Sequence, residues 1–352
     1  MRRAGIVIAV LASVAIPAVT PASAQSYAYT VFQNYLNSYR EQFGIPGLSF
    51  VIIQGGKVVP GAAGGLGKQD VETNVPATAD TPYFVGNLSQ IFGSTLLLEK
   101  CYDQDTLELQ DRVTRWVPSY ADQGVTVGQL LTHQSPSGVY AYDADRFADL
   151  TAVIEECADL PYRHVLAGEI FDRLAMRQSV PGHALDGVLN PGGASFSAAE
   201  LARYNDVLGQ MARHYRVDRG LPVRTAVPLL PVDAATGVIT TVMDLKAFDN
   251  ALRLPGLLSR DALTVMWTQA GGPSPLQTGL GWFVQNYNNE PLIWQFDFTR
   301  DVSSSLIVKL PARDLTFIVL ANSDGLTRTS GLAGGDAQAS PWVKLFLNFF
   351  AP

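Results

Sequence analysis

The chain has few residues spaced for nucleophilic catalysis. On a helix, a hydroxyl followed three positions later by Lys would place a nucleophile and a proton acceptor on one face. The six lysines are Lys57, Lys68, Lys100, Lys246, Lys309 and Lys344, and three residues before them stand Gln54, Gly65, Leu97, Met243, Leu306 and Pro341. None of these is Ser or Thr, so the sequence has no Ser-x-x-Lys pair.

Other reaction chemistries are no better represented. The nearest approaches to a Gly-x-Ser-x-Gly nucleophile turn are 193–197 and 272–276, and neither completes the motif. The four histidines have no paired ligand spacing, and no Gly-x-Gly-x-x-Gly or phosphate loop is present. We interpret the histidines as structural or surface residues and the glycine-rich segment 64–67 as a turn. No metal and no cofactor are predicted.

The stretch 81–98 reads TPYFVGNLSQIFGSTLLL. It resembles the start of the catalytic helix in serine β-lactamases and penicillin-binding proteins of the class C type, which contains Ser-x-x-Lys. Asn87 stands at the Ser position and Gln90 at the Lys position. An amide is not an alkoxide precursor, and it does not accept a proton near neutral pH. The resemblance thus implies a hydrolase scaffold whose first catalytic motif is lost.

The second family motif, Tyr-x-Asn, resembles the segment 140–147. Tyr142 fits the Tyr, unless it is merely an aromatic of the core or surface, and Ala144 stands where the Asn would be. With no Lys nearby, we expect the Tyr142 phenol to keep an ordinary pKa near 10, which makes it a poor base at neutral pH.

The third motif, Lys/His-Ser/Thr-Gly on the strand beside the cleft, resembles the segment 292–298. Gln295, Phe296 and Asp297 occupy the motif, with a register uncertain by one residue. No Lys or His in the chain is followed by Ser/Thr-Gly. In this register Asp297 replaces the Gly and places a carboxyl where acyl transfer develops an oxyanion, which opposes that chemistry.

The resemblance continues along nearly the whole chain. The segment 125–135 is similar to the family's Leu-Leu-Thr-His-x-Ser signature, with Thr126 as a helix N-cap and His133 as a structural His, while 279–282 resembles Gly-x-Gly-Trp. Asp244, in a Gly-x-x-Ser/Thr-x-x-Asp-Leu element, is a candidate helix cap. The implied fold is α/β (α+β): an antiparallel sheet between N- and C-terminal helices, built from 25–100 and 226–352. A helical subdomain, 101–225, is inserted.

The N-terminus predicts export. Arg2 and Arg3 precede an apolar run, and Ala22-Ser-Ala24 offers a cleavage site, so residues 1–24 read as a signal peptide cut after Ala24. No Cys stands directly after the run, and we expect no membrane anchor. The net charge of −7 becomes −9 without the two arginines, which argues against nucleic-acid partners. The predicted location is the periplasm or the exterior.

Cys101 and Cys157 are the two cysteines. In an exported protein they could form a disulfide, or they could be two buried thiols, and their spacing fits no zinc or Cys-x-x-Cys motif. The sequence leaves both readings open.

Three functions remain. The sequence favours an inactive homologue whose cleft, through Asn87, Gln90, Tyr142 and Gln295, binds a peptidoglycan-like, β-lactam or ester ligand without turnover. The first alternative is an active hydrolase with another nucleophile, for which Ser89 and Tyr142 are the nearby candidates. Ser89 lies two residues beyond Asn87, which on a helix turns it by about 200° away from the cleft. The second alternative is a structural or partner-binding protein whose cleft is filled by Phe296 or other side chains.

Overall fold

A computed structural model describes residues 21–183, 185, 196–226, 232–254, 256–271 and 278–352. Residues 1–20, which include most of the predicted signal peptide, lie outside the described residues, and cleavage after Ala24 stays a prediction. Among the described residues, no helix has the length and apolar character needed to cross a membrane.

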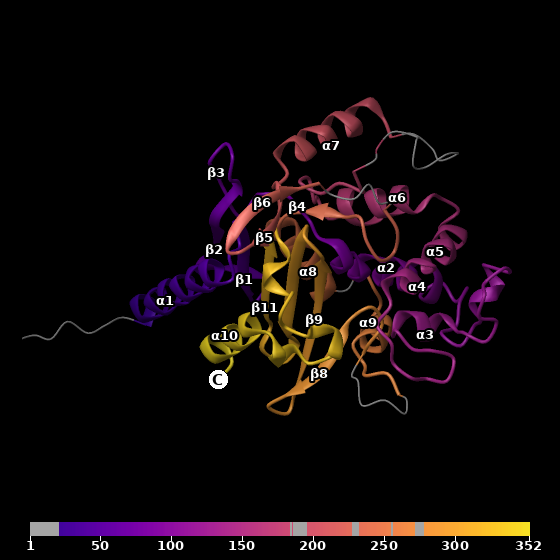
Figure 1. Ribbon diagram of the computed structural model, residues 1–352. Coiled ribbons are helices and arrows are strands. Elements are labelled where there is room, and N and C mark those ends of the chain that lie inside the picture. The colour runs from indigo at the N-terminus through magenta and orange to yellow at the C-terminus, as the bar shows by residue number, and fades with distance from the viewer. Residues whose placement is uncertain (1–20, 184, 186–195, 227–231, 255, 272–277) are drawn as a thin grey trace, which may run out of the picture.

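The centre of the molecule is a seven-stranded sheet in which every neighbouring pair is antiparallel (Figure 1). Its spatial order is β3 (Val75–Pro76), β2 (Lys57–Asp70), β1 (Gly47–Gln54), β11 (Leu315–Ala321), β10 (Ser303–Leu310), β9 (Glu290–Thr299) and β8 (Phe283–Tyr287). The β1–β11 pairing joins the two ends of the chain, with Val51 opposite Ile318. Strands from both ends therefore form one sheet, as the α/β prediction required.

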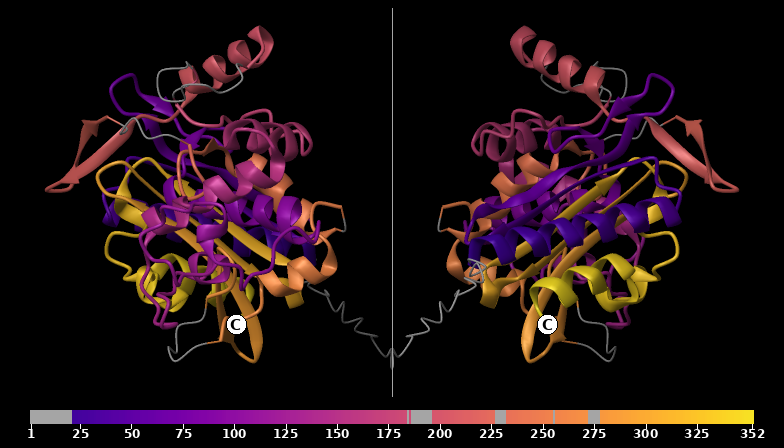
Figure 2. Two further views of the ribbon diagram at one scale, coloured as in Figure 1. Left: turned by 90° about the vertical axis from the view of Figure 1, so that its right-hand side faces the viewer. Right: turned by 90° about the vertical axis from the view of Figure 1, so that its left-hand side faces the viewer.

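Two terminal helices cover one face of this sheet, as the right-hand view of Figure 2 shows. They are α1 (Pro21–Gln42) and α10 (Pro341–Phe350). Phe32 and Phe346 both pack on Phe317 of β11, with ring centroids 5.8 and 5.2 Å apart. Because side chains alternate along a strand, Ile318 points to the opposite face. It joins a second core there with Phe92 and Phe248.

The helices of this second face are α2 (Gln90–Leu97), α8 (Val242–Arg253) and α9 (Arg260–Met266). The segment between α2 and α8 contributes most of the remaining helices, and those up to residue 172 gather on one side of the molecule (Figure 2, left). It contains α3 (Val127–Leu131), α4 (Ala144–Ala148), α5 (Leu150–Ala158), α6 (Tyr162–Val165) and α7 (Ala198–Gln210). Two short strands, β4 (Tyr83–Phe84) just before α2 and β7 (Ile239–Thr240) just before α8, pair with each other. How the chain divides into domains stays a prediction.

Single turns of 3₁₀ or π geometry complete the fold. They are η1 (Gly86–Ser89), η2 (Leu98–Tyr102), η3 (Val113–Arg115), η4 (Leu166–Asp172), η5 (Pro311–Arg313), η6 (Asp324–Leu326), η7 (Leu332–Gly334) and η8 (Ala337–Ala339). Thr126 caps α3 in a reciprocal capping box with Gln129, which confirms its predicted role.

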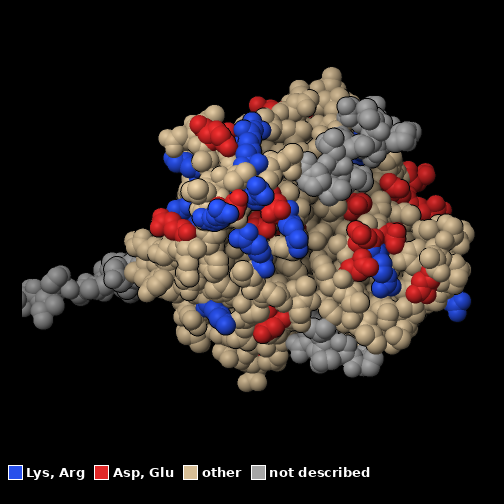
Figure 3. Space-filling model, viewed as in Figure 1, with Lys and Arg blue, Asp and Glu red and all other residues tan. Residues whose placement is uncertain are grey.

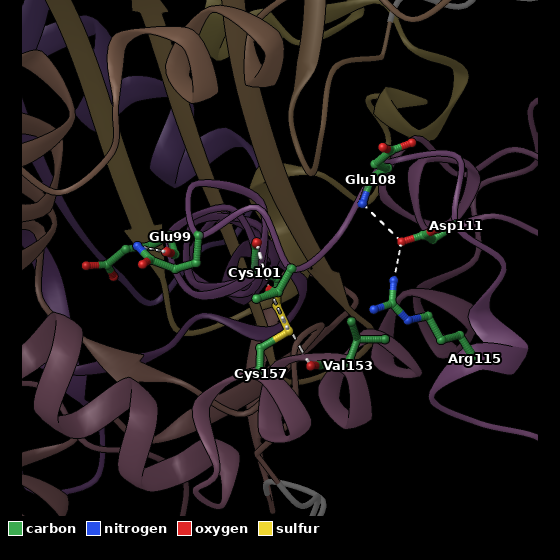
Figure 4. The surroundings of a disulfide bond; sticks show 9 residues. Glu99, Cys101, Glu108, Asp111, Arg115, Val153 and Cys157 are labelled. Atoms are coloured by element: carbon green, nitrogen blue, oxygen red, sulfur yellow. Dashed lines mark hydrogen bonds and ion pairs between the residues drawn. A yellow bond between two sulfur atoms is a disulfide. The ribbon is translucent and has the colours of Figure 1, made fainter.

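A disulfide joins Cys101 of η2 to Cys157 of α5, with Cα atoms 5.5 Å apart (Figure 4). The bond resolves the alternatives that the sequence left open. It ties the helical continuation of α2 to the inserted helices, so the helix that begins near Asn87 is covalently held at its far end.

Two local predictions were wrong. The segment 64–67 is not a turn but part of β2, where Gly65 and Gly67 run so close to neighbouring backbone that a Cβ would lie about 2.1 Å from it. Asp244 does not cap α8: Thr241 does, and the Asp244 carboxyl accepts hydrogen bonds from Gln178 and Ser179. A hairpin of β5 (His214–Asp218) and β6 (Leu221–Thr225) lies outside the main sheet and was not among the predicted elements.

Candidate functional site

Three elements converge where the resemblance places the family site. The turn η1 and the first residue of α2 present Asn87 and Gln90, β9 presents Gln295 and Asp297, and the loop before α4 presents Tyr142. Gln295 and Asp297 share one face of β9 because they are two residues apart. The structure therefore brings the three degenerate motifs together.

Gln90 is fully buried and is the hub of a hydrogen-bonded network. Its Oε1 contacts Nε2 of His133 at 3.1 Å and accepts from Nε2 of Gln295 at 3.1 Å. Its Nε2 donates to the Tyr142 hydroxyl at 3.3 Å. Gln295 also donates to the Gly281 carbonyl at 2.9 Å. These contacts direct the Gln90 amide toward β9, His133 and Tyr142.

His133 is a member of this network rather than a remote structural residue. Burial lowers its pKa to about 4, so the ring is neutral at pH 7. Nδ1 lies 3.3 Å from the Asp143 backbone nitrogen and accepts a hydrogen bond from its N–H. The ring proton is then on Nε2, which donates to Oε1 of Gln90. The network therefore contains no charged side chain. Its signal in the sequence was the Thr-His pair after a helix, but nothing in that pattern specified the partner.

Asn87 is half-buried, and its backbone N–H donates to Oδ1 of Asp297 at 2.9 Å. Gly86 permits this approach, because a Cβ there would lie 2.0 Å from the same oxygen, and its φ of +46° also favours glycine. The contact places the Asp297 carboxyl beside Asn87, the position that the resemblance assigns to the nucleophile, while the register of the third motif stays a prediction.

Asp297 is wholly buried and has two more donors on its carboxyl. Thr299 Oγ1 donates to Oδ1 and Ser303 Oγ to Oδ2, each at 2.9 Å. Burial raises the pKa of Asp297 to about 7 and outweighs the opposing effect of the bonds from Asn87, Ser303 and Thr299. Thr299 and Ser303 are not among the predicted site residues. The one feature of the sequence that could have indicated them is the group of hydroxyl residues at the turn between β9 and β10.

Tyr142 is enclosed by rings. Its ring lies 4.5 Å from that of His133 and stacks at 5.7 Å on Phe296, whose side chain is 4% exposed. Burial, with the nearby Asp297 carboxyl, raises the pKa of Tyr142 well above its usual value, while hydrogen bonds with Gln90 and Asn87 oppose the shift. The expectation of an ordinary pKa near 10 was wrong, because the sequence did not show how deeply the phenol is enclosed.

The remaining sequence candidates are displaced from the chemistry. Ala144 is the first residue of α4 and offers no amide. Ser89 is buried, and its hydroxyl accepts from the Val238 N–H at 3.2 Å. Within the described residues, no group of His, Cys, Asp and Glu is placed to hold a metal ion.

Comparisons with known proteins agree with the fold. A sequence model of the beta-lactamase family matches residues 32–339. No curated protein matches the chain.

Solved structures share the fold at low sequence identity. An octameric penicillin-binding protein homologue from Pyrococcus abyssi is 20% identical with a TM-score of 0.71, over 84% of this chain and 74% of that one. A class C beta-lactamase from Rhodobacter sphaeroides is 17% identical with a TM-score of 0.68, over 92% and 98%. A D-amino acid amidase from Ochrobactrum anthropi SV3 is 17% identical with a TM-score of 0.71, over 92% and 99%. The family match spans most of the chain, and the chain therefore belongs to the beta-lactamase family.

Proposed function

We propose that this protein is an exported member of the beta-lactamase family that has lost acyl transfer and keeps its cleft for binding. The observation that carries the proposal is the uncharged network around Gln90. The Gln90 amide, which is bonded to neutral His133 and to Gln295, cannot act as the general base that takes a proton from a nucleophile. Gln90 stands where the resemblance implies the residue that activates the nucleophile, and its hydrogen bond with Gln295 instead joins α2 to β9.

The contact between Asp297 and the Asn87 N–H supports the same conclusion. A developing oxyanion needs preorganised donors. Here the backbone donor at the nucleophile position is already engaged by a carboxyl, and an anion placed there would meet that carboxyl at close range. Tyr142 does not compensate, because its raised pKa keeps the phenol protonated at neutral pH.

Ligand binding is the function we assign to the cleft. Of the four predicted ligand-binding residues, Asn87 and Tyr142 are half-buried, so they are the side chains that a ligand from solvent would meet first. Gln90 and Gln295 are buried, and Gln90, which accepts from Gln295, donates to the Tyr142 hydroxyl and holds it in place. By analogy with the relatives, the ligand class is peptidoglycan-like, a β-lactam or an ester.

A second candidate, a structural or partner-binding role, is favoured by the position of Phe296. Its ring stacks on Tyr142 and is nearly inaccessible, as the filled-cleft reading requires. An active hydrolase with Ser89 as nucleophile is not supported, because that hydroxyl is buried and bonded to Val238.

Export is part of the proposal. The signal-like N-terminus motivates it, and the Cys101–Cys157 disulfide supports it, since such bonds persist in oxidising compartments. The mature N-terminus of protein recovered outside the cytoplasm should be Gln25. Recovery of the full-length chain in the cytoplasm would contradict export.

The decisive experiment is the intact mass of the mature protein after incubation with a penicillin and, separately, with an activated ester. We expect no stoichiometric adduct. A stable adduct mapped to any residue would overturn the loss of acyl transfer and identify the nucleophile.

The matched variant is Asn87→Ser with Gln90→Lys. We expect it to gain little esterase turnover, because Ala144 and the Gln295–Asp297 segment remain unchanged. Appreciable turnover would show that the two helix positions alone account for the loss. Saturable binding of a penicillin by the unmodified protein, measured calorimetrically, separates ligand binding from the partner-binding alternative.

A further inference from the structure

A second site lies at the other end of the sheet from Asn87. A cavity of about 330 Å³ opens beside α8, α9 and the β10–β11 turn. Lys309 and Thr316 line it from neighbouring positions of β10 and β11. Lys309 is six residues along β10 from Ser303, the partner of Asp297, which places the cavity roughly 20 Å from the family site.

Lys309, which lines the cavity, belongs to a buried charge pair. Lys309, 3% exposed, donates to Oδ1 of Asp249 on α8, which also accepts from Thr316 at 3.2 Å. The Lys309 ammonium lies 5.1 Å from the centroid of the Trp267 ring, a cation–π distance.

The hydrogen bonding of this pair is incomplete. Within the described part of the chain, Oδ2 of Asp249 and Nε1 of Trp267 have no hydrogen-bond partner. The Lys309 ammonium has three N–H donors, and its one hydrogen bond among the described residues goes to Asp249. Buried polar groups are rarely left unpaired, so the ammonium calls for an acceptor inside the cavity.

The other residues that line the cavity indicate what kind of molecule could carry this acceptor. The walls are largely apolar, from Leu252, Leu263, Trp267, Pro311 and Leu315. Charges balance: Lys309 faces Asp249, and Arg253 at the rim is paired with Asp314. An anion would add an unbalanced charge next to Asp249, whereas a neutral molecule would not.

We propose that this cavity binds a small uncharged molecule with an aromatic or aliphatic body and a carbonyl oxygen. The oxygen accepts from the Lys309 ammonium, and the body packs on Trp267 and the leucines. The volume is within the range of small-molecule pockets. The proposal is independent of the function assigned to the family site.

The test uses benzamide as the probe and the indole signals of the tryptophans as the readout. The chain has five Trp, so ¹⁵N-Trp labelling gives a short spectrum in which Trp267→Phe assigns the relevant signal. We expect benzamide to shift the Trp267 signal saturably, with toluene and benzoate each at least tenfold weaker. No saturable shift up to tens of millimolar, or benzoate binding as tightly as benzamide, would overturn the proposal.

Two variants distinguish the contribution of the Lys309 ammonium to benzamide binding from that of the apolar cavity. Lys309→Met with Asp249→Leu removes both charges together, and we expect benzamide to lose tenfold or more in affinity while toluene does not. Leu263→Trp should fill the cavity and abolish the benzamide shift. Its control is Asp261→Trp, an exposed position on the same helix, which should leave binding unchanged. Unchanged benzamide affinity in Leu263→Trp would overturn the proposal even if the double variant does not fold.

Discussion

The two ends of β9 and β10 bury polar groups in opposite ways. At the family site, Gln90, Gln295 and neutral His133 form a network without charge, and the lone carboxyl of Asp297 is satisfied by an N–H and two hydroxyls. At the far end, Lys309 and Asp249 form a buried ion pair. The same sheet thus buries an uncharged polar network at one end and an ion pair at the other.

The difference shows that this scaffold does not exclude a buried lysine. It accepts one where a carboxylate from α8 stands opposite, and it has an amide, Gln90, at the position where the resemblance implies a catalytic lysine. Charge on the visible surface is mixed as well, with basic and acidic side chains interspersed (Figure 3). What is missing at the family site is therefore a catalytic cation rather than the capacity to bury one.

The largest expected effect comes from breaking the ion pair. Lys309→Ala leaves Asp249 buried without its cation, and we expect a loss of about 3–5 kcal/mol in the free energy of unfolding. Urea denaturation measures it. Lys309→Met with Asp249→Leu should recover most of the loss, and a failure to recover would mean that the pair stabilises the fold beyond its own desolvation.

Removing the disulfide tests whether the family-site end depends on the inserted helices. Cys101→Ser with Cys157→Ser opens a bridge with a sequence separation of 56, and we expect a loss of about 4 kcal/mol in the chain-entropy view. Thermal unfolding measures the loss. Gel mobility that does not change with reductant would contradict the bridge itself.

Asp297 should make the family-site end sensitive to pH. Its pKa is about 7 in the folded chain, above that of an unfolded Asp, so the folded state binds more protons between these values. Stability should therefore fall as pH rises from about 4 to 7, by a few kcal/mol, and then level off.

Asp297→Asn isolates this contribution, because groups such as His133 titrate equally in both proteins. We expect the variant to gain stability relative to the parent across that pH range, as measured by urea unfolding at each pH. Parallel pH curves for the two proteins would show that Asp297 is ionised throughout.

The smallest effect belongs to Tyr142. Tyr142→Phe removes one acceptor of the Gln90 amide and should cost about 1 kcal/mol. The ring contacts with His133 and Phe296 are kept, so a loss of several kcal/mol would indicate that the hydroxyl is essential to the network. Chemical denaturation distinguishes the two outcomes.

Much of this architecture could be predicted from the sequence. Segments rich in apolar residues at 48–53, 304–310 and 315–320 predict strands and form β1, β10 and β11, which are buried along most of their length, and the helices at both termini follow their periodicity. The pattern failed for the glycine-rich part of β2, because glycines that admit a close neighbouring strand look like turn residues. It also missed β5 and β6, a short hairpin outside the main sheet.

The sequence by itself determined that Ser-x-x-Lys is absent and that amides stand in its place, because residue identity fixes which groups can ionise. Only the tertiary structure decided that Gln90 bonds to His133, Gln295 and Tyr142, that the Asp297 carboxyl reaches the Asn87 N–H, and that Cys101 meets Cys157. These contacts join residues 43 to 210 positions apart. Local patterns do not encode such distances, since packing of the sheet against its helices sets them.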